Sequence, residues 1–286
     1  MNRELENDLI IYKAESSIRK PARLISELLK NLFQSKDLAW RIFVRDISAQ
    51  YRQSLLGIFW AFFPPIVTSL IFILLQSRNI ISISETSIPY PVYVLIGTTL
   101  WQIFTDSLNA PLRATIAAKP FLVKIYFPHE ALILSAFYLV VFNTLIRATI
   151  IIVVFVYFGI QPTWAILMAP FAILVLILIG MCLGLFLTPI GMLYSDISTS
   201  LPIFTQLLFF ATPVVYNIPD RFPFSILNVI NPVSPILTGI RDLMTVGYIN
   251  NLNNFLIVAF VFLIASFIAL IIYRVSLPII IEKIGS

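Results

Sequence analysis

The polar side chains that could carry chemistry in this sequence lie within long apolar segments. Asn143 and Arg147 are four residues apart, so a helix presents both on one face. A guanidinium near the middle of a bilayer costs roughly 3 kcal/mol, and this face is therefore expected to point toward protein or water. Arg147 would either face a substrate or, as we favour, form a structural bond or reach the outer headgroups. Asp106 is a candidate partner, but helix rise places it nearer the inner surface than Arg147, which argues against a pair.

The residue types of the common enzyme sites are scarce. The sequence contains one histidine, His129, and one cysteine, Cys182, which are too few for a metal cluster or a nucleophile–base pair of the usual kinds. Its nine glycines include neither a GxxxxGK(S/T) phosphate-binding loop nor a GxGxxG motif. We therefore predict no catalytic residues, no metal and no cofactor in this chain. If it moves a molecule uphill, we expect the energy to come from another polypeptide.

The elements that would position these residues are predicted from composition. Of 286 residues, 59% are apolar and 12% are charged, and the mean hydropathy is +0.95. A soluble domain has about twice this share of charged residues. The composition therefore indicates a membrane protein and argues against disulfide scaffolds, disordered chains and basic nucleic-acid-binding domains. Six apolar segments are long enough for transmembrane helices of an all-α polytopic protein: about 57–76, 91–112, 131–158, 164–190, 200–217 and 254–273.

The distribution of Lys and Arg predicts the orientation of these helices. With six spans both termini lie on one side of the membrane, which carries 15 of the 19 Lys and Arg residues, against 3 on the other side. Short loops rich in these residues remain in the cytoplasm. We therefore expect a cytoplasmic segment over 1–56, a transmembrane domain over 57–275 and a cytoplasmic tail over 276–286.

Two amphipathic stripes precede the first predicted span. One runs from Leu24 to Phe33, and the other contains Trp40, Phe43, Val44, Ile47 and Tyr51 opposite several charged residues. Both are interpreted as helices that lie in the inner membrane surface, with the basic face toward anionic headgroups. The alternative is that they pack on other protein, and it suits the second stripe best.

A proline-rich segment lies between the fifth and sixth predicted spans, from Pro213 to Val246. Backbone broken by proline is tolerated at membrane depth only where protein or a water-filled cavity supplies its hydrogen bonds. We interpret the segment as a re-entrant pair of short helices that enter from outside, with a plain external loop as the alternative. Gly180 and Gly184 form a GxxxG motif, which favours close packing within the chain over a dimer contact.

Aromatic residues make up 14% of the sequence and gather on the first two predicted spans. Such faces are mostly core or lipid-facing. The alternative hypothesis is a channel lined by rings, on which the apolar faces of sugars could stack and slide. Together with the intramembrane polar pair, the candidate channel-lining residues are Phe59, Phe63, Tyr93, Trp101, Phe104, Asn143 and Arg147.

Three local strings resemble one known family. They are RDISAQYRQSLLGIFWAFFPP (Arg45 to Pro65), KPFLVKIYFPHE (Lys119 to Glu130), and PVVYNIP (Pro213 to Pro219) followed by NPVSPILTGIRDLM (Asn231 to Met244). In this order, over roughly residues 38–275, they resemble the type-2 ABC exporter permeases for polysaccharides. The resemblance implies a homodimer of six-span subunits with one cytoplasmic ATPase subunit docked under each. ATP and Mg would be bound by that partner, whose closure would push on the permease.

The resemblance also implies roles for particular residues. The ATPase-coupling segment would contain Lys119, Pro120, Phe121, Leu122, Lys124, Tyr126, Phe127, Pro128, His129 and Glu130. The inner gate or channel entrance would contain Arg45, Asp46, Tyr51, Arg52, Ser54 and Gly57. The outer gate would contain Pro213, Tyr216, Pro219, Asn231, Pro232, Pro235 and Arg241. The family usually has arginine where His129 stands, which puts a salt bridge at that point in doubt.

The resemblance implies export of an undecaprenyl-linked polysaccharide, such as O-antigen, capsule or teichoic acid, across the bacterial plasma membrane. A type-2 permease for a drug or lipid is the first alternative. A membrane-embedded glycosyltransferase or acyltransferase would need clustered Asp, Glu or His at a membrane surface, which the sequence does not offer. An ion-coupled carrier is disfavoured by the scarcity of intramembrane acids.

Overall fold

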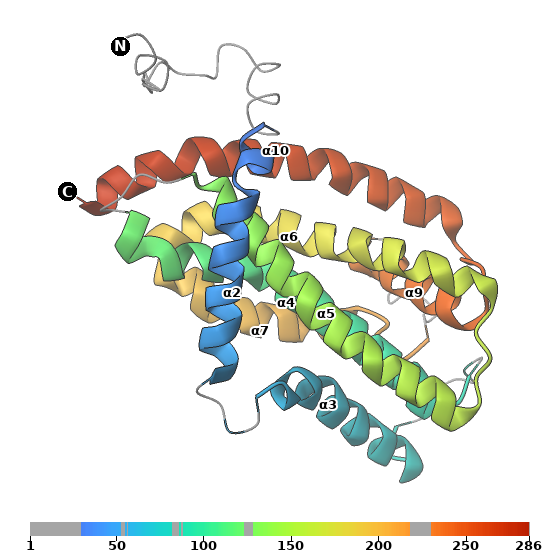
Figure 1. The fold of residues 1–286 in the computed structure, drawn as a ribbon. Coiled ribbons are helices and arrows are strands. Elements are labelled where there is room, and N and C mark those ends of the chain that lie inside the picture. Colours follow the sequence, from blue (N-terminus) through green and yellow to red (C-terminus); the bar gives the residue numbers. More distant parts are fainter. Residues whose placement is uncertain are drawn as a thin grey trace, which may run out of the picture.

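The computed structural model describes residues 30–52, 55, 57–81, 86, 88–122, 128–217 and 230–285. Over these residues all regular secondary structure is helical (Figure 1), which confirms the all-α prediction. The elements are α2 (Lys36–Arg52), α3 (Phe59–Ser77), α4 (Tyr90–Leu122), α5 (Glu130–Phe158), η2 (Trp164–Met168), α6 (Ala169–Leu193), α7 (Ser195–Ala211), α9 (Val233–Thr245) and α10 (Leu252–Gly285).

Among the described residues, four helical stretches are long and apolar enough to cross a membrane. They are Phe59–Ser77, Glu130–Phe158, Trp164–Leu193 and Leu252–Ile284, and they match the first, third, fourth and sixth predicted spans. Helices α4 and α7 occupy the positions of the second and fifth. Helix α4 has 33 residues but carries several polar side chains, and α7 has 17 residues, whereas one crossing takes roughly 20. These elements are those of a multi-pass membrane protein.

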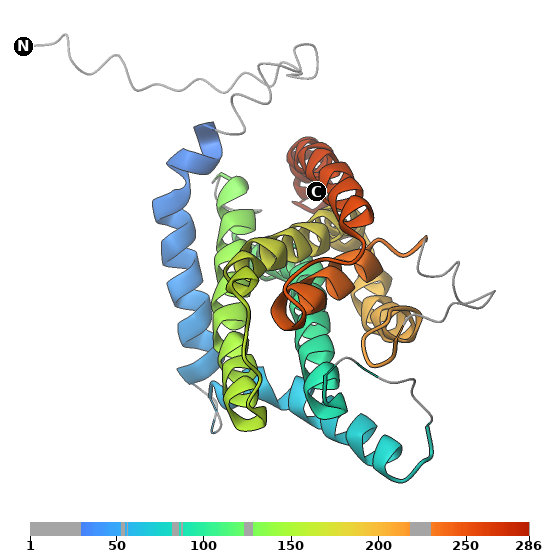
Figure 2. The same ribbon diagram turned by 90° about the vertical axis from the view of Figure 1, so that its right-hand side faces the viewer.

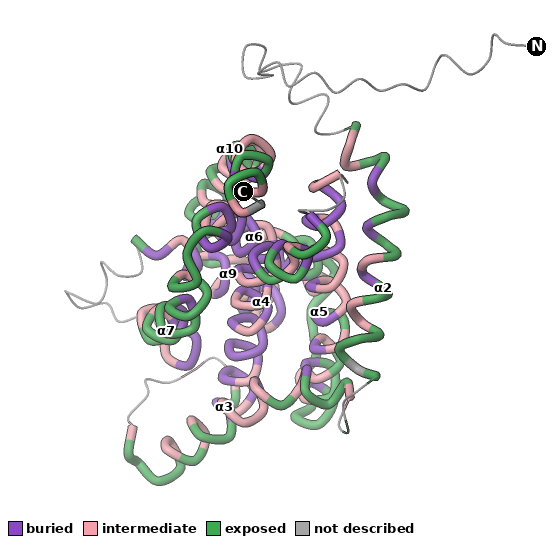
Figure 3. The backbone as a smooth tube through the Cα atoms, turned by 90° about the vertical axis from the view of Figure 1, so that its left-hand side faces the viewer, coloured by how far each residue is buried: buried purple, intermediate pink, exposed green. Residues whose placement is uncertain are grey.

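Helix α4 lies at the centre of the molecule and carries the longest set of buried residues (Figure 3). It packs most extensively against α6, while α3 and α5 contact it from other sides and α10 covers α6. The close approach depends on Gly180 and Gly184. A Cβ atom at Gly180 would collide with the Ser107 side chain, and one at Gly184 with the carbonyl oxygen of Leu108. The GxxxG motif therefore packs within the chain, as predicted.

Helix α2 contains the second amphipathic stripe, and it packs on protein. It runs across the direction of α6 and α10 in Figure 1 and lies beside α5 in Figure 2. The Phe43 ring is buried, 5.9 Å from the ring of Tyr138 and 6.0 Å from that of Phe142. The protein-packing alternative is thus right for this face, because α5 offers aromatic rings to it, while Trp40 and Val44 remain exposed. The first stripe falls largely outside the described residues.

Two helices continue past their predicted ends. The second predicted span stops at residue 112, but α4 runs on to Leu122, and α10 runs past residue 273 to Gly285. Apolar side chains beyond the charged residues explain both extensions. Leu122 packs with Leu132 at the start of α5, and Leu277 is buried against the core. Hydropathy falls where charges appear, but a helix continues as long as one of its faces is buried.

Candidate functional site

A cavity of about 490 Å³ lies between α2, α3, α4 and α5; we call it the inner cavity. It brings together residues that the sequence assigned to separate roles, because Asp46 was placed at the inner gate and Asn143 and Arg147 in the channel. Six alanines supply much of its wall, and their small side chains leave space between the helices. The lining residues are Asp46, Ala49, Gln50, Trp60, Ala61, Pro64, Gln102, Asp106, Ala110, Arg113, Ala114, Ala117, Ser135, Ala136, Leu139, Val140, Asn143 and Arg147.

The guanidinium of Arg147 connects three helices at the deep end of the inner cavity. Pro65 has no N–H, so the carbonyl of Ala61, four residues earlier in α3, lacks its helical donor. Arg147 Nε donates to that carbonyl at 3.1 Å, and its Nη2 lies 2.6 Å from Asp106 Oδ2 on α4. The Arg147 side chain is 5% exposed, which confirms that its face points inward. The structure thus assigns Arg147 the structural bond that the sequence favoured.

The pair between Arg147 and Asp106 corrects the sequence-based depth argument. That argument ended the second span at residue 112 and so placed Asp106 close to the inner surface. In the structure Asp106 lies 16 residues before the end of α4, and Arg147 lies 17 residues after the start of α5. At 1.5 Å per residue both are about 25 Å from those neighbouring helix ends. The two charges therefore meet at one depth.

The inner cavity is lined by two carboxylates, Asp46 and Asp106, and two arginines, Arg113 and Arg147, so its charges balance. Asp106 is paired with Arg147 and also accepts a hydrogen bond from Gln102 Nε2 at 3.1 Å. Asp46 is paired with Arg45 at 2.8 Å. Arg113 is exposed and forms no ion pair with any described residue. Sequence reasoning missed Gln102 and Arg113, although with Asp106 they form a polar stripe along one face of α4.

The predicted inner-gate residues lie at the end of α2 and in the turn that follows. Arg45, Asp46 and Arg52 are on α2, and of these only Asp46 lines the inner cavity. Gly57 has φ +48°, a left-handed backbone conformation that glycine adopts without a Cβ penalty, and it helps the chain turn into α3. The side chain of Tyr51, and Ser54 altogether, lie outside the described residues.

The aromatic residues proposed for a channel divide into two groups. Phe59 and Phe63 are 49% and 41% exposed at the start of α3, where the ring of Trp60 meets that of Phe63 edge to face, with centroids 5.3 Å apart. Trp101 and Phe104 are instead buried in the core of the helix bundle, with ring centroids 5.2 Å apart. The channel-lining prediction is wrong for these two, because α4 is central and its neighbours cover both rings.

The two described ends of the predicted coupling segment are fixed to neighbouring helices. Lys119 to Leu122 form the last turn of α4, where Phe121 is 53% exposed. Pro128, His129 and Glu130 lead into α5, and the buried Glu130 carboxylate lies 3.5 Å from Arg274 Nε on α10. Lys124, Tyr126 and Phe127 lie outside the described residues.

A salt bridge is found one residue beyond the position where the sequence put one in doubt, at Glu130. Its cation is Arg274 on α10, which sequence reasoning did not connect with this segment. Burial lowers the pKa of the neighbouring His129; the charge of Glu130 opposes this shift and that of Arg274 adds to it. Burial therefore favours the neutral imidazole of His129.

Side chains of α4 and α9 bind four consecutive backbone carbonyls where α7 has ended. Arg241 Nη2 donates to the carbonyls of Val214 at 2.6 Å and Pro213 at 3.2 Å. Tyr90 donates to the carbonyl of Val215 at 3.2 Å, and Tyr93 donates to that of Tyr216 at 3.0 Å. The Arg241 guanidinium also lies over the Tyr93 ring, 3.8 Å from its centroid. We call Tyr90, Tyr93, Arg241 and the segment 213–216 the outer cluster. Sequence reasoning missed the role of Tyr90.

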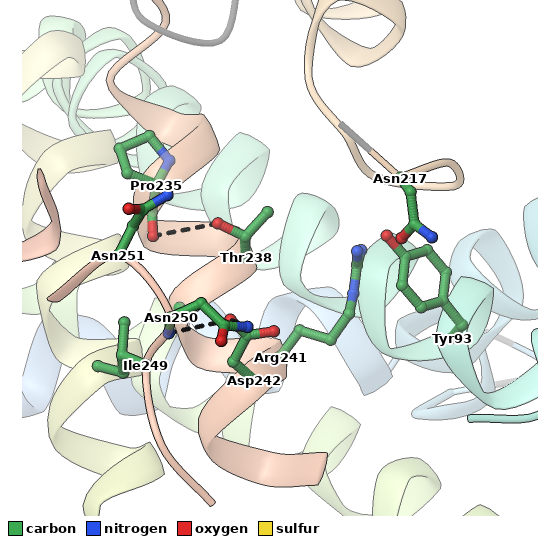
Figure 4. Close-up of a pocket in the computed structure, with 10 residues that line it drawn as sticks. Tyr93, Asn217, Pro235, Thr238, Arg241, Asp242, Ile249, Asn250 and Asn251 are labelled. Carbon is green, nitrogen blue, oxygen red and sulfur yellow. Dashed lines mark hydrogen bonds between the residues drawn. The ribbon is translucent and has the colours of Figure 1, made fainter. Parts of the chain in front are cut away.

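Asn231 fixes the start of α9 beside the outer cluster. Its side chain donates to Thr212 Oγ1 at 2.7 Å and accepts from the backbone N–H of Val233 at 3.0 Å. Pro232 is the N-cap of α9. A second cavity, of about 360 Å³, lies beside Arg241 and is lined by Tyr93, Asn217, Pro235, Thr238, Gly239, Asp242 and residues 249–251 (Figure 4). Pro219 lies outside the described residues.

Comparisons with known proteins agree with this architecture. The sequence profile described as "ABC-2 type transporter" matches residues 37–245, which include both sites. The O-antigen export system permease protein RfbA of Myxococcus xanthus is 26% identical over 216 residues, which cover 74% of this chain and 82% of the relative. The protein of the same name from Klebsiella pneumoniae is 24% identical over 228 residues, or 77% of this chain and 85% of the relative. The chain belongs to the ABC-2 type transporter family.

Proposed function

We propose that this chain is the permease subunit of an ATP-driven exporter that moves a lipid-linked polysaccharide from the cytoplasm across the bacterial plasma membrane. The observation that carries the proposal is its similarity, over about three quarters of its length, to relatives named as O-antigen export permeases. The cargo class is an O-antigen, capsule or teichoic acid polymer on an undecaprenyl carrier. The chain is a transport subunit and contains no phosphate-binding loop of its own.

The proposed assembly is a homodimer with two copies of a cytoplasmic ABC ATPase. Force from the ATPase would enter through the coupling segment. Leu122 packs with Leu132, and Glu130 is paired with Arg274, so both ends of the segment are fixed to the helix bundle. Exposed Phe121 offers an apolar contact to the partner. A push on this segment would then reach α4, α5 and α10 together.

The proposed membrane arrangement has six spans with both termini in the cytoplasm. Helices α4 and α7 supply the second and fifth spans, and the excess of Lys and Arg on one side sets the direction. Helix α9, with 13 residues, is too short to cross and would be the second half of a re-entrant outer gate. The outer cluster supports this placement, because it supplies the hydrogen bonds that irregular backbone needs at membrane depth.

Deletion of the gene tests the transport function. We expect lipid-linked glycan to accumulate on the cytoplasmic side and surface glycan to be lost, as measured by labelling intact and permeabilised cells. Normal surface glycan with a trapped drug or lipid would assign the chain to another cargo. Turnover of a lipid-linked sugar donor by the purified chain alone would make it a transferase.

Co-purification with the cognate ATPase tests the coupling segment. Phe121→Ala is expected to lower the affinity for the ATPase about tenfold, because truncation of an apolar contact residue at a protein interface has an effect of this size. Tyr248→Ala is the matched control, because Tyr248 is also exposed but lies after α9, far along the chain from the coupling segment. Equal retention of the ATPase by both variants would contradict the assignment.

A further inference from the structure

The cavity of about 360 Å³ beside Arg241, which we call the outer cavity, is lined mainly by polar side chains. Pro235 and Ile249 supply apolar surface beside them. Its volume and its mixture of apolar wall with a few placed polar groups are those of a small-molecule site. The polar residues of its lining are Tyr93 on α4, Asn217 after α7, Thr238, Arg241 and Asp242 on α9, and Asn250 and Asn251 before α10 (Figure 4).

Two opposite charges line the outer cavity without forming an ion pair. Arg241 and Asp242 are adjacent in sequence, but Arg241 extends toward Tyr93 while Asp242 lies beside Asn250 (Figure 4). None of the ion pairs found among the described residues joins the two. The guanidinium would repel a cation in the cavity, and the carboxylate would repel an anion. The charges of the lining therefore favour a neutral ligand.

The same side chains have hydrogen-bonding groups left over. Asp242 Oδ2 accepts from the backbone and side-chain nitrogens of Asn250 at 3.3 and 2.8 Å, whereas its Oδ1 accepts no hydrogen bond from a described residue. The side-chain amide of Asn251 likewise has no partner in the described part of the chain. Arg241 Nε is buried in the wall and is also unpaired among these residues. Buried donors are normally paired, so an unpaired one beside a free acceptor and a free amide indicates a site for a ligand or water.

We propose that the outer cavity binds one neutral sugar unit, a pyranose ring of the exported glycan, on the outer side of the membrane. A sugar hydroxyl both donates and accepts, so the ring can donate to Asp242 Oδ1 and accept from the amide of Asn251. Its apolar C–H groups suit the surface of Pro235 and Ile249. The inference rests on the proposed function, because that function supplies the glycan and places α9 on the outer side.

Binding of simple glycosides to the full-length chain tests the proposal. The chain is placed in lipid nanodiscs, so that no sugar-based detergent competes, and titrations are followed by saturation-transfer NMR. The probes are methyl glucoside, galactoside and mannoside, each with its uronate and its 2-amino counterpart. At least one neutral glycoside should bind, and about tenfold more tightly than its own anionic and cationic counterparts. Binding of none of the three, or equal binding of a charged counterpart, would overturn the proposal.

Asp242→Asn separates a role in binding from a role in structure. It keeps an oxygen that can accept from Asn250 but removes the charge, so the neutral glycoside should bind about tenfold more weakly. The uronate should bind more tightly than it does to the unmodified chain, because its repulsion by the carboxylate is gone. A merely structural role would not move the two affinities in opposite directions. Asp196→Asn, exposed on α7, is the matched control and should change neither affinity. Unchanged affinities in Asp242→Asn would show that the site is wrong.

Asn251→Ala tests an uncharged contact of the same site. It is expected to weaken binding of the neutral glycoside about fivefold, the effect of one neutral hydrogen bond. Asn253→Ala is the matched control, because Asn253 is also exposed but lies outside the lining. Equal affinities of these two variants would contradict the contact. If a glycoside binds as expected while gene deletion leaves glycan export intact, the site stands and the exporter function fails. If deletion traps glycan inside the cell and no glycoside binds, the exporter function stands and the site fails.

Discussion

Arg147 and Arg241 are two buried arginines that stabilise irregular backbone in different ways. Both donate to carbonyls that lack helical donors, Arg147 to Ala61 and Arg241 to Pro213 and Val214. Arg147 also has a carboxylate partner, that of Asp106, while each of the two arginines lines a cavity. Arg241 has the face of Tyr93 and forms no ion pair with a described residue.

The difference lies in how each buried positive charge is stabilised. Around Arg147 one charge is neutralised by another, and the Asp106 side chain is 20% exposed. Around Arg241 the charge is stabilised by carbonyl dipoles and a ring, and its Nη2 is shared between two carbonyls of one segment. Removal of Arg241 should therefore harm folding most, while removal of Arg147 should affect stability less.

The largest expected effect is that of Arg241→Ala. It removes both hydrogen bonds to the segment 213–214 and leaves two buried carbonyls without donors, which costs about 4 kcal/mol of unfolding free energy. The measurement is the fraction of monodisperse protein after heating in detergent. Arg78→Ala is the matched control, because Arg78 is exposed after α3 and should be neutral. Equal stability of the two variants would show that the outer cluster does not hold the fold.

The next effect concerns the close approach of α4 to the outer cluster. A Cβ at Gly97 would collide with the carbonyl oxygen of Val214 and with Arg241 Nη2. Gly97→Ala is therefore expected to cost about 3 kcal/mol, near the upper end for overpacking, because the contacted atom is backbone. The double variant Gly97→Ala, Arg241→Ala should lose less unfolding free energy than the two single variants lose together, because both changes disturb the same contact. Additive losses in the same heating assay would contradict this shared origin.

Several of these features could be predicted from the sequence because they depend on short-range spacing. The face shared by Asn143 and Arg147 follows from four-residue spacing, and the packing role of Gly180 and Gly184 from the GxxxG motif. Both follow from helix geometry alone, and both are found in the structure. The proline-rich composition of the segment after α7 likewise predicted that protein or a water-filled cavity would have to supply its hydrogen bonds, and the outer cluster supplies them to residues 213–216 from protein side chains.

The partners of these residues could not be predicted, because they depend on where helices end and on which helices meet. The depth of Asp106 was misjudged because the predicted span ended at residue 112, where the hydropathy of the sequence falls. The helix α4 and its buried residues continue to Leu122. Trp101 looked like a channel residue because a sequence shows an aromatic face but not which helix is central. The pairing of Glu130 with Arg274 joins residues 144 positions apart, which no local pattern indicates.

The third effect tests the charge pair of the inner cavity. Arg147→Ala should cost about 2 kcal/mol, less than Arg241→Ala, because Asp106 is partly exposed and can be hydrated once its partner is gone. Asp106→Asn removes the charge but keeps a hydrogen-bond acceptor. A double-mutant cycle over these two changes should give a coupling energy of about 1 to 2 kcal/mol. A coupling energy near zero would mean that Arg147 acts through the Ala61 carbonyl alone.

The smallest expected effect is that of breaking an uncharged buried pair, which serves as a reference for the loss of the buried arginines. The hydroxyls of Tyr273 on α10 and Thr115 on α4 are buried, 3.1 Å apart, in the same inner half of the molecule. Tyr273→Phe should cost about 1 kcal/mol, since Thr115 keeps its hydrogen bond to the Pro111 carbonyl at 2.8 Å. Thr115→Val is the informative counterpart, because it leaves the Tyr273 hydroxyl buried without this partner and should cost more in the heating assay. If Tyr273→Phe lost as much stability as Arg147→Ala, the loss in both variants would follow from the burial of a polar group. The charge of Arg147 would then have no special part in stability.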